Sequence, residues 1–271
     1  MEVRNWKDKF PKENRYFETK NGILYCGDCL EIMKKFPEES VDLIVTSPPY
    51  NVGVDYDIWN DKLSLEEYFE FVRNFLKLFK IILKKDGRFA INILYEGNMK
   101  HIGRQNRLSL LCEYYSIMKE VGLEYNCIVD LVENQPHRVK YTAWGSWLSA
   151  SSPYIYNPKE CIIVGYKEKW KKSNKGKSTL SKDLFIEIVS GMWKYQAEMK
   201  GFTKANFSED IPYKSIQGLS YEEDIVLDPF LGSGTTAVVC EKLNRRWIGI
   251  EISPNYCEIA KRRIEEVKNV G

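Results

Sequence analysis

The sequence predicts an α/β fold with a mainly parallel sheet. Short β-branched runs alternate with amphipathic stretches along the chain, which is the order that parallel strands with crossover helices require. The chain has 271 residues, of which 44% are hydrophobic, so a sizeable core can form. No internal repeat or low-complexity tract interrupts the pattern. We therefore expect residues 1–271 to form a single domain.

The overall charge is nearly balanced. The 40 basic and 38 acidic residues leave a net charge of +2, so any nucleic-acid-binding patch must be local. No apolar run reaches the length of about 18 residues that a membrane span needs. Residues 1–15 are polar and charged and do not resemble a secretory signal. We expect a cytoplasmic protein without a membrane partner.

Cysteine and histidine usage argues against a metal site. Among the seven cysteines, Cys26 and Cys29 form a Cys-x-x-Cys pair, but a second ligand pair with zinc-site spacing is missing. The pair also lacks the usual context of a redox motif, so we expect reduced structural thiols. With two histidines in the chain, a His-based triad or a His-rich metal site is not expected.

The first half of the chain predicts two strands around a short helix, and then a long helix. Strands are expected at 23–26 and 41–46, with a helix at 30–36 between them. Pro48 and Pro49 cannot continue a ladder, so the chain must leave the sheet after residue 46. Ser64 and Glu67 form a capping-box pattern, and apolar residues then repeat at helical spacing over 65–83.

Further elements follow in alternation. Asp86-Gly87 is expected to end the long helix, and the later elements are listed here in order: strand 88–94, helix 107–121, strand 125–132, strand 160–166, a strand ending at residue 228, helix 235–243, strand 246–250 and a last helix. Ser253 is the expected N-cap of that helix and Pro254 its first residue. Residues 133–158 lack periodicity and predict an ordered loop.

The segment 167–182 is the most basic window of the chain. Counting Lys159 just before it, the window contains eight lysines. Such a run is typical of a solvated or mobile loop, and it is equally compatible with a loop that contacts phosphates.

One motif suits a nucleoside ligand. Asp228-Pro229-Phe230-Leu231-Gly232-Ser233-Gly234-Thr235-Thr236 lies between a strand and a helix, where glycines allow a tight turn and close approach to a ligand. Glu251, 23 residues after Asp228, ends the next strand and suits a grip on ribose hydroxyls. The lysine of a nucleotide-phosphate loop is absent, and Ala237 replaces the third glycine of a dinucleotide site. A nucleoside cofactor or a plain tight turn remains.

A second motif, Thr46-Ser47-Pro48-Pro49-Tyr50, follows a buried strand, and ligands bind at such strand ends in doubly wound sheets. The Pro-Pro pair makes a rigid shelf. Ser47 and the Pro48 carbonyl can accept hydrogen bonds from an exocyclic amine, and Tyr50 offers a face on which a base can stack. Taken alone, Pro-Pro-Tyr is also compatible with a surface binding motif or a plain loop.

Together these segments resemble the DNA amino-methyltransferases of restriction-modification systems, in the permuted order called the beta group. The Asp228 segment matches the family's cofactor loop, and the Ser47 segment matches its catalytic loop. Gly27-Asp28 matches a position that contacts the cofactor adenosine. Residues 144–160 resemble a further block, and 207–216 resemble the segment that closes over the cofactor's methionine, although Thr203-Lys204-Ala205 replaces the usual His-Pro-Ala.

The resemblance implies a Rossmann-like methyltransferase fold, with a seven-stranded sheet, helices on both faces and circularly permuted motif order. It implies S-adenosylmethionine as cofactor. The residues that it assigns to the cofactor are Asp28, Asp228, Pro229, Phe230, Gly232, Ser233, Gly234, Thr235 and Glu251. Those that it assigns to catalysis are Ser47, Pro48, Pro49 and Tyr50. It also implies a small DNA-recognition insertion around 167–207, with residues 95–110 as a second candidate for sequence reading.

The implied reaction is direct methyl transfer to an exocyclic amine of a base flipped out of duplex DNA. Relatives with Ser before Pro-Pro-Tyr mostly modify the N4 amine of cytosine and those with Asp mostly modify adenine N6, so Ser47 favours cytosine. Methylation of a cytosine ring carbon is a poor fit. That reaction needs a Cys nucleophile, usually after a Pro, and the chain lacks a Pro-Cys dipeptide. Double-stranded DNA is the implied partner, together with a cognate restriction endonuclease. The oligomeric state stays open, a dimer included.

Three alternatives remain. The first is an adenine-N6 DNA methyltransferase, since both amines need similar acceptors. The second is an RNA or protein amide methyltransferase, which usually has Asn before Pro-Pro-Tyr and the ordinary motif order. The third is a catalytically silent DNA-binding relative, which the two intact loops disfavour.

Overall fold

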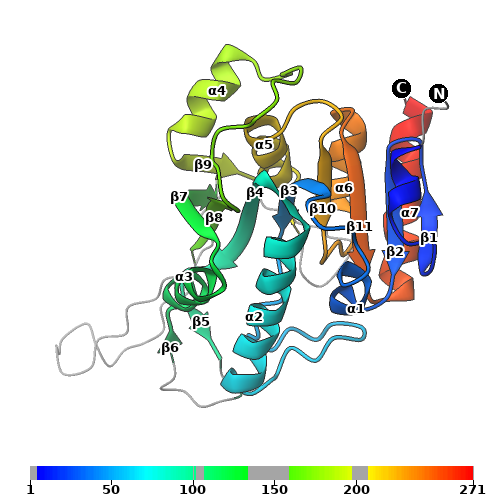
Figure 1. The fold of residues 1–271 in the computed structure, drawn as a ribbon. Coiled ribbons are helices and arrows are strands. Elements are labelled where there is room, and N and C mark those ends of the chain that lie inside the picture. The colour runs from blue at the N-terminus through cyan, green and yellow to red at the C-terminus, as the bar shows by residue number, and fades with distance from the viewer. Residues whose placement is uncertain (1–4, 100, 102–106, 134–158, 197–206, 271) are drawn as a thin grey trace, which may run out of the picture.

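The computed structural model describes residues 5–99, 101, 107–133, 159–196 and 207–270. They form one large sheet between two layers of helices (Figure 1). In spatial order the strands are β1 (Arg15–Glu18), β2 (Gly22–Cys26), β11 (Arg246–Glu251), β10 (Ile225–Asp228), β3 (Val41–Thr46), β4 (Leu83–Leu94), β8 (Glu160–Tyr166), β7 (Glu124–Glu133) and β9 (Met192–Tyr195). A separate small ladder pairs β5 (Gly97–Asn98) with β6 (Arg107–Leu108).

The helices bury apolar residues against both faces of the sheet. One face packs against α1 (Cys29–Met33), α2 (Leu65–Ile82) and α3 (Leu110–Val121). The other packs against α5 (Asp210–Leu219), α6 (Thr235–Lys242) and α7 (Pro254–Val270). A short helix, α4 (Lys182–Val189), precedes β9. The predicted α/β architecture with helices on both faces is confirmed.

The sheet is mainly parallel, as predicted, but it has nine strands rather than seven. Within it, β1 and β8 run antiparallel to their neighbours, and the other pairings are parallel. The two additional strands are β1 and β9 at the edges, each of four residues. The four residues of β10 form one buried run, whereas β1 and β9 are partly exposed and show no clear hydrophobic pattern over so short a length.

Most predicted bounds hold to within a few residues. The strands β3 and β8 have the predicted limits, and the capping box of Ser64 and Glu67 is present. Two boundaries differ. The strand β4 begins at Leu83, directly after α2, and absorbs Asp86-Gly87 through a shift of register against β3. The helix expected from residue 107 begins at Leu110, because Ser109 caps it and residues 107–108 form β6.

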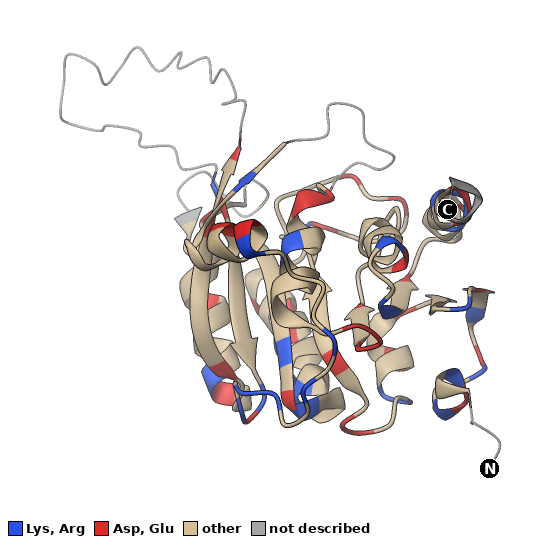
Figure 2. Ribbon diagram, turned by 90° about the horizontal axis from the view of Figure 1, so that it is seen from above, with Lys and Arg blue, Asp and Glu red and all other residues tan. Residues whose placement is uncertain are grey.

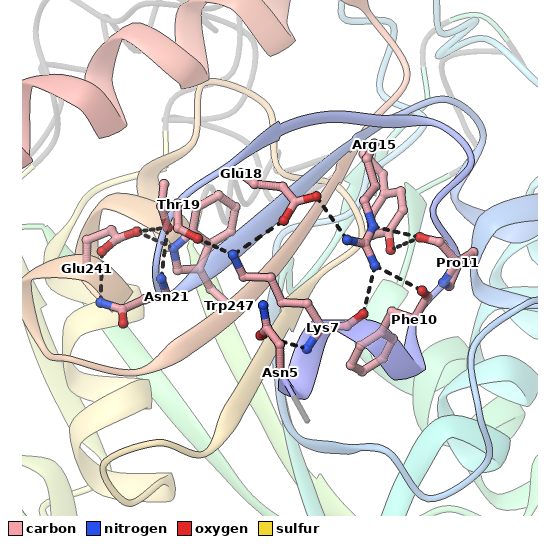
Figure 3. Close-up of polar contacts among 11 residues, drawn as sticks. Asn5, Lys7, Phe10, Pro11, Arg15, Glu18, Thr19, Asn21, Glu241 and Trp247 are labelled. Atoms are coloured by element: carbon pink, nitrogen blue, oxygen red, sulfur yellow. Dashed lines mark hydrogen bonds and ion pairs between the residues drawn. The ribbon is translucent and has the colours of Figure 1, made fainter. Parts of the chain in front are cut away.

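A polar cluster ties the N-terminal segment to the edge of the sheet (Figure 3). The Glu241 carboxylate on α6 accepts hydrogen bonds from Thr19, from the Asn21 amide at 3.0 Å and from the Trp247 indole at 2.9 Å. The guanidinium of Arg15 donates to three carbonyls of the preceding turn, among them Lys7 at 2.7 Å. These bonds fix β1 and β2 beside β11. The last residue of β11 is Glu251, which the sequence predicts to bind ribose hydroxyls.

Part of the basic segment lies at the edge of the sheet where the parallel strands begin. Lys172 forms ion pairs with Asp42 (3.7 Å) at the start of β3 and with Asp224 (3.3 Å) just before β10. The Lys167 ammonium, also buried, donates to the Leu83 carbonyl at 2.9 Å. Two lysines of the run therefore neutralise or satisfy buried groups of the fold. Blue and red segments are interspersed along the described ribbon (Figure 2).

All seven cysteines are free thiols, in agreement with the prediction of reduced structural cysteines. Among the residues that the structure describes, no helix is long and apolar enough to cross a membrane.

Candidate active site

A cavity of about 350 Å³ opens at the carboxyl ends of the central parallel strands. Its wall combines the ends of β2, β3, β4, β10 and β11 with the loop that follows Tyr50. The aromatic and large apolar wall residues include Tyr50, Tyr56, Ile58, Trp59, Phe71, Phe207, Phe230 and Tyr256. A concave, largely apolar site with a few converging polar groups is the usual form of a small-molecule site.

The glycine-rich turn after β10 forms one wall of the cavity. Gly232 and Gly234 have positive φ values of 55° and 87°. A Cβ atom on Gly234 would lie 2.9 Å from the Cβ of Ala260 on α7, so this position has no room for a side chain. Arg263, on the same helix, donates to the Ser233 carbonyl (2.9 Å) and the Thr235 hydroxyl (3.0 Å). The helix α7 therefore fixes the shape of the turn.

Glu251 ends β11 and faces the cavity. Its carboxylate accepts hydrogen bonds from the backbone N–H groups of Gly232 and Ser253, both at 2.8 Å. Burial raises the pKa of Glu251, and those backbone donors oppose the rise. Each carboxylate oxygen has a second lone pair, so the group is held in place by the protein and can still accept from a ligand.

Asp228 joins the two predicted loops. Its carboxylate accepts from the Thr46 hydroxyl at the end of β3 and from the Thr236 hydroxyl at the start of α6, both at 2.6 Å. Burial raises its pKa to about 6 although these hydrogen bonds lower it. Asp228 is 2% exposed and does not belong to the cavity wall. This geometry points to a link between the loops rather than to the cofactor contact expected from sequence.

The catalytic-loop candidate follows β3, the strand next to β10, and lines the same cavity as the glycine-rich turn. The Ser47 and Tyr50 hydroxyls are hydrogen-bonded at 2.8 Å, and both side chains line the cavity. The Pro49 carbonyl accepts from Tyr68 on α2 at 3.1 Å, whereas the Pro48 carbonyl accepts no hydrogen bond from any residue that the structure describes. Pro48 is therefore the carbonyl of this pair that is left to serve a ligand.

Asp61 organises the loop that follows Tyr50. Its buried carboxylate accepts four backbone N–H groups, those of residues 51–54, at 2.8–3.0 Å. Farther along this loop, the Asp57 carboxylate accepts from Asn255 (3.0 Å) and Ser253 at the start of α7. One carboxylate therefore shapes the loop beside Tyr50 and another fastens it over the cavity.

Among the polar wall residues that sequence reasoning missed are Asn92 and Glu160. They lie near the end of β4 and at the start of the antiparallel neighbour β8, and the Asn92 amide donates to Glu160 at 2.6 Å. The signal available in the sequence was the single Asn inside the apolar run 89–94. Their proximity is a matter of strand register, which the sequence alone does not give.

Eleven of the thirteen predicted site residues line the cavity. They are Asp28, Ser47, Pro48, Pro49, Tyr50, Pro229, Phe230, Gly232, Ser233, Thr235 and Glu251. Asp228 and Gly234 lie behind the wall. Asp28 also caps α1, where its carboxylate accepts from the Leu30 N–H at 2.7 Å. Other predicted segments lie outside the described residues: 134–158 with Trp144, residues 100 and 102–106 of the 95–110 region, and Thr203-Lys204-Ala205.

Known proteins match this chain over most of its length. The family model for N6/N4-type DNA methylases matches residues 41–262. The type II methyltransferase M.MjaVI of Methanocaldococcus jannaschii is 41% identical over 180 residues, which cover 66% of this chain and 89% of that protein. M.ScaI of Streptomyces caespitosus is 28% identical over 260 residues, which cover 92% of this chain and 83% of that protein.

Solved structures share the fold. A putative DNA modification methylase from Thermus thermophilus, complexed with S-adenosyl-L-methionine, superposes with a TM-score of 0.72 at 24% identity, covering 90% of this chain and 93% of that one. The PvuII DNA methyltransferase, described as cytosine-N4-specific, superposes with a TM-score of 0.70 at 22% identity, covering 96% and 94%.

Proposed function

The chain belongs to the N6/N4 family of DNA methylases, and on that premise we propose that it transfers a methyl group from S-adenosylmethionine to the N4 amine of cytosine in duplex DNA. The observation that carries this proposal is that the Ser47-Pro48-Pro49-Tyr50 shelf, the glycine-rich turn and Glu251 all line one cavity. A methyl donor and an acceptor amine would meet in this shared space.

The cavity fits an adenosyl cofactor. Glu251 is held by two backbone donors and suits a ribose diol, and Asp28 lies beside it on the wall. Gly232 has open space where a Cβ would lie, so its backbone leaves room for a ligand. Phe230 and Tyr256 offer apolar and aromatic surface for a purine ring. When bound, S-adenosylmethionine supplies an electrophilic methyl group on a sulfonium.

The shelf suits an exocyclic amine. The Ser47 hydroxyl and the Pro48 carbonyl can accept the two amine hydrogens and draw the nitrogen toward tetrahedral geometry. Tyr50 can stack on the ring, and the base must leave the duplex to reach this position. In this account the residues act by positioning and electrostatics, and no covalent enzyme intermediate is needed.

The choice of cytosine rests on Ser47. Family members with Ser at this position mostly modify cytosine, and a hydroxyl presents the amine with a neutral acceptor. The partner that we propose is double-stranded DNA, and relatives named as type II methyltransferases support a cognate restriction endonuclease as a second partner. We propose the insertion around 167–207 as the candidate for sequence recognition.

The proposed substrate class can be tested with methyl-labelled cofactor. The protein is incubated in parallel with plasmid DNA, total RNA and a protein extract, and label is counted in each polymer. We expect label in plasmid DNA alone. Label in RNA or protein with none in DNA would overturn the assignment.

The role of the shelf is tested by Ser47→Ala and Tyr50→Ala. Both variants should bind the cofactor with wild-type affinity in calorimetry and should lose methylation by about 100-fold or more, the usual effect of removing a group that acts on the transition state. A variant that binds cofactor and keeps full activity would remove that residue from the mechanism.

A further inference from the structure

A chain of hydrogen bonds leads from Ser47 to a carboxyl group that the proposed mechanism does not use. The Ser47 hydroxyl contacts the Tyr50 hydroxyl at 2.8 Å, and the Asn92 amide donates to that same hydroxyl at 2.8 Å. The Asn92 amide also donates to the Glu160 carboxylate at 2.6 Å. All four side chains belong to the cavity wall.

The donor directions along this chain depend on Glu160. An ionised carboxylate accepts and cannot donate, so it holds the amide nitrogen of Asn92 toward itself. The second amide hydrogen then goes to the Tyr50 oxygen, and the Tyr50 proton is available to Ser47, although either hydroxyl can be the donor in that contact. Ser47 keeps a lone pair for the cavity.

The reversed amide is unfavourable while Glu160 is ionised, because it would aim the carbonyl oxygen of Asn92 at the carboxylate. The observed orientation leaves that oxygen buried with no hydrogen-bond partner among the described residues. A buried acceptor without a partner costs about 1–3 kcal/mol. The hydrogen bond from the Asn92 amide nitrogen to the Glu160 carboxylate offsets the cost of this unpaired oxygen.

The surroundings of Glu160 favour titration closer to neutral pH than for an ordinary glutamate. Burial raises its pKa, the hydrogen bond from Asn92 lowers it, and the charge of Glu133 on β7 raises it further. Tyr50, Tyr195 on β9 and Cys161 are the other titratable groups that interact with it among the residues described.

We propose that Glu160 is a positioning residue for methyl transfer, whose carboxylate acts through Asn92 and Tyr50 to fix the hydroxyl of Ser47 toward the target amine. The negative charge also lies in the cavity where positive charge develops on the amine nitrogen. Protonation of Glu160 removes both effects, so the transfer rate falls as the pH falls through the pKa of Glu160. This inference rests on the proposed function.

The test is the pH profile of single-turnover methylation. Wild-type protein should show an acidic limb, and Glu160→Gln should lack that limb. Above the limb the variant should be slower by about 10- to 100-fold, the factor that a hydrogen bond to a charged group is worth. Glutamine is nearly isosteric with glutamate, so the fold and the cofactor affinity should be unchanged. Its amide can donate as well as accept, so it no longer fixes the orientation of Asn92.

Two further variants separate the chain from a general structural effect. Glu133→Gln should shift the limb to lower pH, because removing a negative charge lowers the pKa of Glu160, and should leave the plateau rate unchanged. Tyr50→Phe leaves the carboxylate charge in place and should slow transfer by no more than Glu160→Gln does. The double variant should be no slower than Glu160→Gln, since both changes break the same chain.

An infrared titration without DNA or cofactor gives an independent readout. Acidification should produce a carboxylic acid band, and part of this band should be missing in Glu160→Gln. The missing part should titrate in wild type with the same midpoint as the kinetic limb. If wild-type protein methylates DNA and the limb survives in Glu160→Gln, this inference alone is overturned. A wild-type protein inactive on DNA would overturn the proposed function, and this inference with it.

Discussion

At the scale of single residues, Asp228 shows how a loop identified from sequence can act indirectly. Its carboxylate accepts from Thr46 at the end of β3 and from Thr236 at the start of α6, which are 190 positions apart in the chain. The group links the loop after β3 to the glycine-rich turn and lies behind the cavity wall. Buried polar groups that are fully paired in this way specify one arrangement of the surrounding backbone.

Asp228 should also leave a signature in the pH dependence of stability. The folded carboxyl titrates at about 6 against an ordinary value of 3.8, so the folded state binds this proton more tightly than the unfolded state. Its contribution is therefore fully present below pH 3.8 and is lost as the pH rises through 6. Between those limits the free energy of unfolding of wild type should fall, relative to Asp228→Asn, by about 3 kcal/mol.

Denaturant unfolding of both proteins from pH 3.5 to 7 measures this difference. A constant difference over the whole range would mean that Asp228 is not the perturbed group.

At the scale of elements, the loop after β3 depends on Asp61. Replacing it with alanine removes the acceptor for four backbone N–H groups, so the amides of residues 51–54 should exchange with solvent faster than in wild type. Methyl transfer should slow, because Tyr50 adjoins this loop. Asp61→Asn keeps one acceptor oxygen and should lie between the two. Unchanged exchange at residues 51–54 in the alanine variant would contradict this role.

The pairing of β2 with β11 predicts a strict requirement for glycine at residue 22. A Cβ there would lie 1.8 Å from the Trp247 ring, so Gly22→Ala should destabilise the fold by about 1–3 kcal/mol. In a Trp247→Ala background the same change should cost much less. Equal costs in the two backgrounds, measured by thermal unfolding, would show that the ring is not the cause.

Local patterns predicted the strands that carry the site and most of the site residues. The buried run at 41–46 ends shortly before Pro48, and the glycine-rich turn follows β10. Both loops could therefore be placed at strand ends from sequence. The pairing of Asn92 with Glu160 depends on register between β4 and β8, and the contact of Thr46 with Asp228 depends on which strands are neighbours. Such nonlocal contacts leave no periodic signal along the chain.

At the scale of the whole molecule, the two ends of the parallel strands differ in their surroundings. The cavity lies at the carboxyl ends of the strands. The basic segment begins at their amino ends, where Lys172 pairs with Asp42 and Asp224. This geometry favours a structural and solvated interpretation of the run's first part over phosphate contact.

The salt dependence of DNA binding tests that division. Combined Lys169→Gln, Lys171→Gln, Lys175→Gln and Lys177→Gln should leave the slope of log Kd against log salt at its wild-type value. If these lysines bound phosphates, the slope would decrease by about one for every phosphate that the variant no longer neutralises. A reduction of that size would place DNA on the basic segment.

The central claim is that the Ser47 shelf presents a cytosine amine to the methyl donor. It is tested most directly by methylating plasmid DNA with labelled cofactor, digesting the product to nucleosides and separating them. We expect the label to elute as N4-methyldeoxycytidine, and we expect Ser47→Ala to abolish this product. Label in N6-methyldeoxyadenosine would contradict the claim.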